Sequence, residues 1–510
     1  MSHGGERMED RYDVIVVGGG SAGCAAASRL SEDPHRRVLL LEAGPDPDPI
    51  PEMVSDATQQ TRLLLESPYV VMYPTVRHVD GSTFYSLAGR IMGGGSSVNV
   101  MAAPRPTKYD LDGWAARGNP DWSYDRVLPV LKRMESDQDF PDSAIHGSSG
   151  PLYIKRSMPL DQMVSGRFGA LLDRAKAMGL PLCPDSNVPE PYGICTSPFT
   201  IKDGVRQSTN VAYLNLARGR PNLTIIAEAP ALSLAVDGHR VNGVRFEKDG
   251  HSYTALADRV VLSAGVYHSP QILMLSGIGP AAELERLGIG VVHPLDGVGE
   301  NYQDHAVVYM TFEGPSDLVE DSLAPRFRLM IKSDPARTCP DFHIHMRPPT
   351  EVSGLKRMMP VSLHLLEQRN RGRVSLQSAD PHDLPAVDAR LLEHPDDIEA
   401  VTAAMQFVKE LLDHESMRAY YGPLIQPGPK DNWAHFARAT HNSYHHGVGT
   451  CMMGPASDPM AVVDQTLRVH GMDNLWVADA STMPTVTHAN TNLTCIMIGE
   501  RVADFVAAAS

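Results

Sequence analysis

The sequence predicts an α/β protein with two domains, one a discontinuous nucleotide-binding domain and the other an α+β domain built on an antiparallel sheet. Three observations predict this fold. A glycine-rich turn between an apolar strand and a helix lies near the start of the chain, further short strands follow from residue 222, and a later block alternates polar and apolar residues. The length of 510 residues is enough for two or more domains.

The first predicted unit is a strand, a turn, a helix and a second strand. Residues 13–17 form an apolar run, residues 18–23 read Gly-Gly-Gly-Ser-Ala-Gly, a helix extends to Leu30, and a second strand covers residues 38–41. A G-x-G-x-x-G turn in this setting is typical of a Rossmann-like unit, with the ligand's pyrophosphate on the N-terminus of the helix.

Each residue type in this turn has a physical role. Gly18 permits the tight turn, Gly20 lets the pyrophosphate approach the backbone, and Gly23 lets the helix pack closely on the strand. Glu42 follows Gly23 by 42 − 23 = 19 residues, close to the spacing of about 20 expected for a carboxylate that binds the ribose hydroxyls. Its charge disfavours a 2′-phosphorylated nucleotide.

Two alternatives exist for the same turn. It could be a glycine-rich turn with no ligand, or its G-x-S-x-G pattern could be the nucleophile elbow of a hydrolase with Ser21 as nucleophile. The elbow explains neither the second strand nor Glu42, so we favour nucleotide binding.

Charge and hydropathy limit the partners. Lys plus Arg is 45 and Asp plus Glu is 61, a net charge of −16, which disfavours nucleic acid and anionic membranes. No apolar run reaches the ~20 residues of a membrane span, and residues 1–11 lack the apolar core of a secretion signal. We therefore expect a cytoplasmic protein without a membrane span.

The six cysteines form no C-x-x-C pair. Such sparse spacing indicates reduced thiols rather than a disulfide framework or a metal site. A bridge between Cys183 and Cys195 stays open.

Residues 89–99 concentrate glycines and small hydroxyl residues, whereas residues 67–86 before them show no clean periodicity. A run of this kind lets the backbone approach a large flat ligand. A flexible surface loop is the alternative.

Strands are predicted over residues 222–227, 231–236, 241–247 and 259–262, with an Asp-Gly turn between the second and third. A helix capped by Ser269, with Pro270 at its start, is expected after the last strand. These elements return the chain to the nucleotide domain.

The block from about 306 to 430 alternates with period two. Residues 341–346, 360–365 and 373–377 read as antiparallel strands, and a helix is expected over 396–412. His343 and His345 share one face of their strand, and His364 lies on the corresponding face of the next. This face is either solvated or covers the predicted nucleotide ligand, and in the second case we expect at least one of the three histidines to touch substrate. No carboxylate or cysteine is interleaved to suggest a metal.

These motifs, in this order, resemble the glucose/methanol/choline (GMC) oxidoreductases, FAD-dependent enzymes that oxidise alcohols. The likeness rests on the first fingerprint and on residues 89–112, 265–279, 299–305, 444–450, 477–481 and 488–492. It runs from near residue 12 to near residue 505. Met92, Val266 and Tyr302 depart from the usual pattern, which leaves the substrate open rather than the class.

The resemblance implies an active-site histidine at His446, not His445, and a second active-site residue at Asn490. Alcohol oxidation needs a base that is neutral near pH 7, which suits histidine. We expect His446 to take the hydroxyl proton while hydride passes to flavin N5, and Asn490 to donate to the developing alkoxide. The alternatives are a turn histidine bonded to backbone at 446 and an asparagine that caps the last helix, expected over 493–507.

The resemblance also implies FAD as the cofactor, held non-covalently. No second dinucleotide fingerprint follows the first, so FAD is expected to be the only organic cofactor. The residues expected to contact it are Gly18, Gly20, Ser21, Ala22, Gly23, Glu42, Ala43, Arg90, Gly94, Ser97, Asn99, Val100, Met101, Ala102, Ala231, Asp479, Ala480, Asn490 and Thr491. The candidate substrate residues are His343, His345, His364 and His445, and no metal site is expected.

The predicted activity is oxidation of a primary alcohol, of the small aromatic or heteroaromatic class, to an aldehyde, with O2 or another acceptor taking the electrons. A sugar, choline or aliphatic alcohol is an alternative substrate, and a flavin-containing hydroxynitrile lyase is an alternative activity. We assign residues 11–155, 203–305 and 436–510 to the FAD domain and residues 156–202 and 306–435 to the substrate domain.

Overall fold

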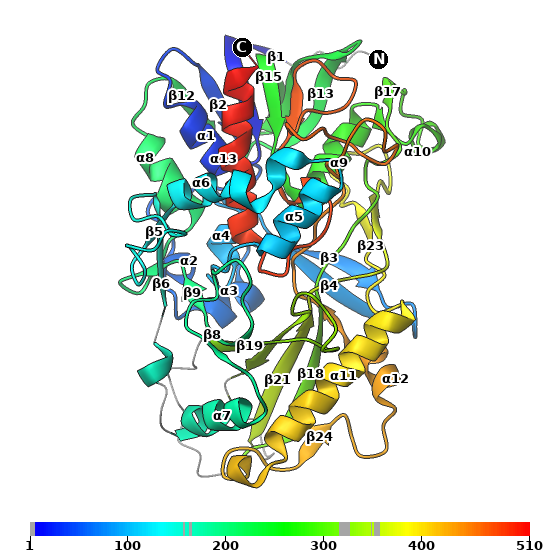
Figure 1. Cartoon of the computed structure of the whole chain (residues 1–510). Helices are drawn as coiled ribbons and strands as arrows, with labels where there is room; N and C mark the ends of the chain where they lie inside the picture. Colours follow the sequence, from blue (N-terminus) through cyan, green and yellow to red (C-terminus); the bar gives the residue numbers. More distant parts are fainter. Residues whose placement is uncertain are drawn as a thin grey trace.

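The computed structural model describes residues 6–156, 159–162, 166–315, 327–347, 349–350 and 357–509. Residues 1–5 of the polar start considered above lie outside this set. Two large sheets organise the described chain, the first in the upper part of Figure 1 and the second in the lower part. None of the described helices is both long and apolar enough to cross a bilayer.

The first sheet has seven strands in the order β12-β2-β1-β15-β14-β13, with β26 paired to β15. The parallel part joins β12, β2, β1, β15 and β26, and the antiparallel part joins β15, β14 and β13. The strand bounds are β1 (Glu6–Val17), β2 (Val38–Leu41), β12 (Leu223–Ile226), β13 (Ala231–Asp237), β14 (Arg240–Lys248), β15 (His251–Leu262) and β26 (Leu475–Val477). Strands from three distant parts of the chain therefore form one sheet, as the predicted discontinuity requires.

Two helices pack together on this sheet, and the last helix stands across its front in Figure 1. They are α1 (Ser21–Leu30) and α13 (Asn492–Ala508). Their backbones meet at Gly499, where an added Cβ would lie 2.2 Å from the Ala22 carbonyl oxygen. The contact brings the C-terminal helix to the N-terminus of α1, where the predicted ligand binds.

The second sheet has eight strands in the order β24-β18-β21-β20-β19-β8-β7, with β25 paired to β18. The strand bounds are β7 (Leu182–Cys183), β8 (Gly193–Thr196), β18 (Ala306–Glu313), β19 (Phe327–Ile331), β20 (Phe342–Met346), β21 (Met358–Leu365), β24 (Leu424–Gln426) and β25 (Asn442–Ser443). Its apolar face packs on α11 (Pro395–Leu412) through a core that includes Ile344, Leu363, Met405 and Val408. The histidines of β20 and β21 occupy the opposite face.

Shorter elements complete the described fold. The remaining helices are α2 (Glu52–Ser55), α3 (Gln60–Glu66), α4 (Gly95–Val98), α5 (Lys108–Ala116), α6 (Tyr124–Met134), α7 (Gly166–Ala177), α8 (Asn215–Ala217), α9 (Gly265–Leu275), α10 (Ala281–Arg286) and α12 (Trp433–Thr440). The remaining strands are β3 (Val70–Val76), β4 (Thr83–Gly89), β5 (Glu135–Asp137), β6 (Leu152–Arg156), β9 (Pro198–Phe199), β10 (Ile201–Lys202), β11 (Val205–Arg206), β16 (Ile278–Gly279), β17 (His293–Pro294), β22 (Arg373–Ser375) and β23 (Ala386–Asp388).

The predicted start of α9 is wrong. The helix begins at Gly265, so Pro270 lies inside it rather than at its start. A proline in this position cannot donate to the carbonyl four residues earlier, and the Thr450 hydroxyl supplies that bond to the Val266 carbonyl at 2.6 Å. Ser269 accepts from the Ala264 amide and donates to Asp479.

Two further expectations are settled by the fold. The stretch 67–86, which shows no clean periodicity, contains β3 and most of β4, which pair antiparallel. All six cysteines are free, although Cys183 and Cys195 pair in register on adjacent parallel strands.

Candidate active site

The glycine turn before α1 has the shape that a dinucleotide requires. Gly18 has φ +99°, and an added Cβ would lie 2.4 Å from the Ser263 carbonyl oxygen; at Gly23 it would lie 1.9 Å from the Gly18 oxygen. At Gly20 the nearest atom would be 3.9 Å away, so this position faces open space. No side chain caps the N-terminus of α1. The free amide donors and the open space at Gly20 fit a pyrophosphate.

Glu42 closes the other side of this turn. Its two carboxylate oxygens accept from the Gly19 and Gly44 amides, each at 2.7 Å. Burial raises the pKa of this carboxyl, and the two amide bonds oppose that effect. Each oxygen keeps a lone pair, so Glu42 can still accept from ribose hydroxyls.

The loop formed by residues 89–99 packs against the glycine turn. A Cβ added at Gly94 would lie 2.8 Å from Gly20 Cα. The Ser97 hydroxyl donates to the Met92 carbonyl, and the Asn99 side-chain oxygen accepts from the Met101 amide and Arg206. In this structure these two polar side chains therefore hold the loop itself.

The other predicted FAD contacts surround the same region or its continuation. Asp479 accepts from the Gly265 amide and Ser269 and, through its other oxygen, from the Ser481 amide. Ser21 accepts from Asn492 at 2.8 Å. Arg90 and Val100 are exposed. The remaining predicted contacts are small or buried residues: Ala22, Ala43, Met101, Ala102, Ala231, Ala480 and Thr491.

The bond from Asn492 also bears on the hydrolase alternative. Within the described chain, the hydrogen-bond partner of the Ser21 hydroxyl is an amide rather than a histidine. A serine nucleophile needs a base beside it, so this site lacks the arrangement of a hydrolase.

His446 and Asn490 meet at the centre of the candidate active site. Asn490 Nδ2 lies 3.2 Å from His446 Nε2. The last helix is capped at Thr491 without a side-chain bond, so the alternative that Asn490 caps it is wrong. His446 lies close to His305 because β25 pairs with the start of β18, which follows His305 directly.

A chain of hydrogen bonds fixes the tautomer of His446. His305 Nε2 lies 2.9 Å from the Thr487 carbonyl oxygen, which only accepts, so this nitrogen carries a proton. Burial lowers the pKa of His305 to about 3, so its Nδ1 is unprotonated and accepts from His446 Nδ1, 2.9 Å away. His446 therefore presents the lone pair of Nε2 beside Asn490.

Burial also lowers the pKa of His446 well below its usual range, with further lowering by nearby charge. The imidazole is therefore neutral at pH 7 and able to take a proton. Asp304 accepts from the backbone amides of both His305 and His446 and from Ser443. Burial raises the pKa of the Asp304 carboxyl to about 6.

His445 points to a different place. It adopts a left-handed backbone conformation with φ +64°, and its Nδ1 accepts from the Leu87 amide of β4 at 3.2 Å.

The three histidines of the second sheet are brought together. His343 lies opposite His364 in the register, and the ring centroids of His345 and His364 are 5.0 Å apart. Tyr444 lies between them and His446, with ring centroids 3.9 Å from His364 and 4.4 Å from His446. His343 and His364 are buried, so the solvated-face alternative is wrong.

Sequence reasoning missed several residues here. His305 and Asp304 lie in the quoted stretch 299–305, but no role had been assigned to them. Arg328 lies in no motif, and only the register of β19 against β20 places it beside the histidines.

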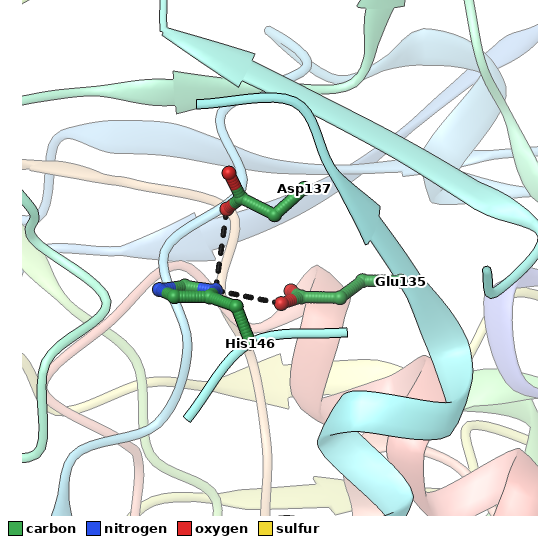
Figure 2. Close-up of side chains that lie close together, drawn as sticks. All are labelled: Glu135, Asp137 and His146. Carbon is green, nitrogen blue, oxygen red and sulfur yellow. Dashed lines mark hydrogen bonds and ion pairs between the residues drawn. The ribbon is translucent and has the colours of Figure 1, made fainter. Parts of the chain in front are cut away.

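A second buried cluster lies away from this site, around His146 (Figure 2). His146 Nδ1 lies 2.7 Å from Glu135 and 3.2 Å from Asp137, and Nε2 lies 2.9 Å from Asp185. Both ring nitrogens face carboxylates, so neither offers a metal a lone pair, and the pKa of His146 is raised to about 9 by these partners against the effect of burial. Arg105 and Arg156 pair with the same carboxylates. Three carboxylates and two guanidinium groups are balanced by a protonated His146.

Comparison with known proteins gives one consistent result. The family models described as GMC oxidoreductase match residues 12–307 and 368–499. The choline oxidase of Arthrobacter globiformis is 35% identical, over 99% of this chain and 96% of the relative, and the 5-(hydroxymethyl)furfural oxidase of Methylovorus sp. is 34% identical, over 97% and 98%. The crystal structure of pyridoxine 4-oxidase from Mesorbium loti superposes with a TM-score of 0.89 at 28% identity, covering 97% of this chain and 98% of that one.

Proposed function

The chain belongs to the GMC oxidoreductase family of FAD-dependent alcohol oxidases and dehydrogenases, and on this basis we propose that it oxidises a small aromatic or heteroaromatic primary alcohol to the aldehyde. The observation that carries the proposal is the position of His446 Nε2. The hydrogen bonds of His305 to His446 Nδ1 and to the Thr487 carbonyl keep His446 Nε2 unprotonated. It lies beside the amide of Asn490.

These two residues act on the substrate hydroxyl. An alcohol is too weak an acid to ionise unaided, so the proton leaves to a neutral base as the hydride leaves the carbon. His446 Nε2 takes the proton, and Asn490 Nδ2 donates to the oxygen as its negative charge grows. Bound FAD supplies the acceptor for the hydride.

The substrate class is supported by the relatives and by the sheet face above the base. Two of the compared proteins are named for heteroaromatic alcohols, hydroxymethylfurfural and pyridoxine. Tyr444, His364 and His345 supply aromatic surfaces next to His446, and flat rings stack on such surfaces. At least one of His343, His345 and His364 contacts the substrate in this proposal.

The chain is organised into two domains with separate roles in this reaction. Residues 11–155, 203–305 and 436–510 hold non-covalent FAD, and residues 156–202 and 306–435 cover the substrate. We place the enzyme in the cytoplasm, as unpaired cysteines suit a reducing compartment. O2 or another acceptor reoxidises the flavin.

An absorption spectrum followed by anaerobic additions of alcohols tests the proposal. We expect a yellow protein that bleaches with an aromatic primary alcohol, and air then separates an oxidase, with fast recovery of colour, from a dehydrogenase, with slow recovery. His446→Ala lowers the rate constant of bleaching by about 10²- to 10⁴-fold. The exposed His382 provides a control, because His382→Gln leaves this rate unchanged. A yellow protein that no alcohol bleaches but that releases cyanide from a hydroxynitrile contradicts the proposal in favour of a lyase.

A further inference from the structure

The histidine face of the second sheet also carries a buried cation that has no counter-charge among the residues that the structure describes. Arg328 lies on β19 opposite Cys195 of β8, and its side chain is fully buried. Its Nε donates to the Ser197 hydroxyl at 3.1 Å. Within the described chain, Nη1 and Nη2 have no hydrogen-bond partner and pair with no carboxylate.

The sheet register places this guanidinium next to the substrate face. Leu329 pairs with Ile344, so Arg328, one residue earlier on β19, lies across from His345 on β20. The charge of Arg328 contributes to lowering the pKa of His343, of His345 and of His446, after burial. Arg328 is therefore close enough to act electrostatically on His446 and on the histidines of β20.

The neighbouring histidines cannot neutralise it. Burial lowers the pKa of each of His343, His345 and His364 well below the usual range, so all three are neutral at pH 7. Among the described residues, one buried ring nitrogen of each histidine also lacks a hydrogen-bond partner: Nε2 of His343 and His345 and Nδ1 of His364. Unpaired buried polar atoms thus gather on this face of the sheet.

A buried guanidinium without a partner is unfavourable. Arginine keeps its proton in proteins, so the group cannot escape the cost by losing its charge. A water molecule could accept from its N–H groups but would leave the charge uncompensated, and removing one partner from a buried ion pair is strongly destabilising. An anion that arrives with the substrate would relieve this cost.

We propose that Nη1 and Nη2 of Arg328 bind a carboxylate of the substrate, so that the preferred substrate is an aromatic or heteroaromatic alcohol that also carries a carboxylate. This inference rests on the proposed alcohol oxidation at His446. The carboxylate takes no part in the reaction. The CH2–OH group gives its proton to His446 and its hydride to the cofactor, and the carboxylate stays unchanged.

The geometry of arginine selects this anion. The planar guanidinium matches the two oxygens of a carboxylate with two parallel hydrogen bonds. The same charge repels a quaternary ammonium, so the site differs from one made for choline. Both Nη atoms are shielded from solvent, so binding requires movement. We expect Tyr444, half-buried against His364 and His446, to turn aside.

Two non-reactive probes test the binding step without turnover. Benzoate and benzamide have nearly the same shape and differ in charge. Each is titrated into the FAD-loaded protein, with calorimetry and the change in flavin absorbance as readouts. We expect benzoate to bind at least ~10-fold more tightly than benzamide, in the range of a charge-assisted hydrogen-bonded pair. Equal affinities in the wild-type protein overturn the proposal without any variant.

Variants locate the charge. Arg328→Met removes the preference for benzoate, and Arg328→Lys keeps part of it because the charge stays while the planar fork is lost. Arg167→Met is the matched control: Arg167 on α7 is also buried with unpaired Nη atoms, but it lies over the ring of Phe168. It keeps the wild-type preference. Melting temperature and flavin content show which variants are folded. A folded Arg328→Met protein that still prefers benzoate overturns the proposal.

Turnover separates this inference from the proposed function. We compare 4-(hydroxymethyl)benzoate with 4-(hydroxymethyl)benzamide and expect kcat/KM to favour the carboxylate at least ~10-fold, chiefly through KM. Bleaching by both at equal kcat/KM keeps the alcohol oxidation and overturns the role of Arg328. Tight, Arg328-dependent benzoate binding without bleaching by any alcohol overturns the oxidation instead. Stronger binding of benzenesulfonate or inorganic phosphate than of benzoate overturns the assignment to a carboxylate.

Discussion

Nδ1 of His305 lies 2.9 Å from Nδ1 of His446, and the second nitrogen of His305 is bound to the Thr487 carbonyl. His305 therefore acts as a positioning residue, because it decides which nitrogen of His446 carries the proton. The Nε2 lone pair of His446 faces the Asn490 amide only in that tautomer.

Replacement of His305 tests this relationship. In His305→Leu, His446 loses its acceptor, and we expect the rate constant of anaerobic flavin reduction to fall about 10- to 100-fold while the flavin content is kept. His305→Gln restores much of the rate, because its amide can accept from His446 and donate to Thr487. Equal loss in both variants would indicate a packing role only.

The pH dependence of flavin reduction reports the protonation of the base. Burial lowers the pKa of His446, and in the proposed mechanism its neutral form is the one that accepts the proton. The rate constant is therefore flat from pH 8 to below 6.5 and falls only in more acidic solution. Burial raises the pKa of Asp304 to about 6, so this neighbour also titrates in the acidic range. If the rate constant falls near pH 6 in the wild-type protein but not in Asp304→Asn, the fall reports the Asp304 carboxyl. A fall near pH 6.5 in both proteins contradicts the lowered pKa of His446.

Asn490 is expected to act on the reacting oxygen. Asn490→Ala lowers the rate constant of flavin reduction by about 10²- to 10³-fold, the range for loss of one donor to a developing oxyanion. Asn490→His keeps a donor and retains more of the rate. A fall in melting temperature without a fall in rate would show that Asn490 serves the helix instead.

Two glycines of the nucleotide turn are expected to respond differently to the same change. Gly20→Ala adds a methyl group with no protein atom nearer than 3.9 Å, so the apoprotein melts near the wild-type temperature but binds FAD about 10-fold more weakly, since the methyl group occupies space needed by the pyrophosphate. Gly23→Ala places a methyl group 1.9 Å from the Gly18 oxygen and prevents correct folding. FAD titration and thermal unfolding measure both. Wild-type FAD affinity in Gly20→Ala would contradict the placement of the ligand.

The His146 cluster makes stability depend on pH. The pKa of His146 is raised from 6.5 to about 9 in the folded protein, so its stabilisation is fully present below pH 6.5 and is lost as the pH rises through about 9. The melting temperature of the wild-type protein should fall across this window. His146→Gln should be less stable at pH 6 but lose little more by pH 9. Parallel curves for the two proteins would contradict a protonated His146.

Local pattern was sufficient for much of the fold. The unit from β1 to β2 has its predicted turn and helix, because its apolar runs and glycines are consecutive and the covalent chain itself sets their spacing. The strands β13 and β14 and the helix α11 follow for the same reason. The start of α9 was misplaced, because the hydroxyl that satisfies the freed Val266 carbonyl comes from Thr450, far along the chain.

Short contiguous motifs in the sequence were sufficient to predict the family and the nucleotide turn, and they named His446 and Asn490 as candidate active-site residues. The tautomer of His446 and the surroundings of Arg328, by contrast, follow from the tertiary structure. Both depend on strand pairing between distant segments, β25 on β18 and β19 on β20, and on burial that removes water from the paired groups. Register and desolvation are properties of the assembled sheet, so no local pattern of residues reports them.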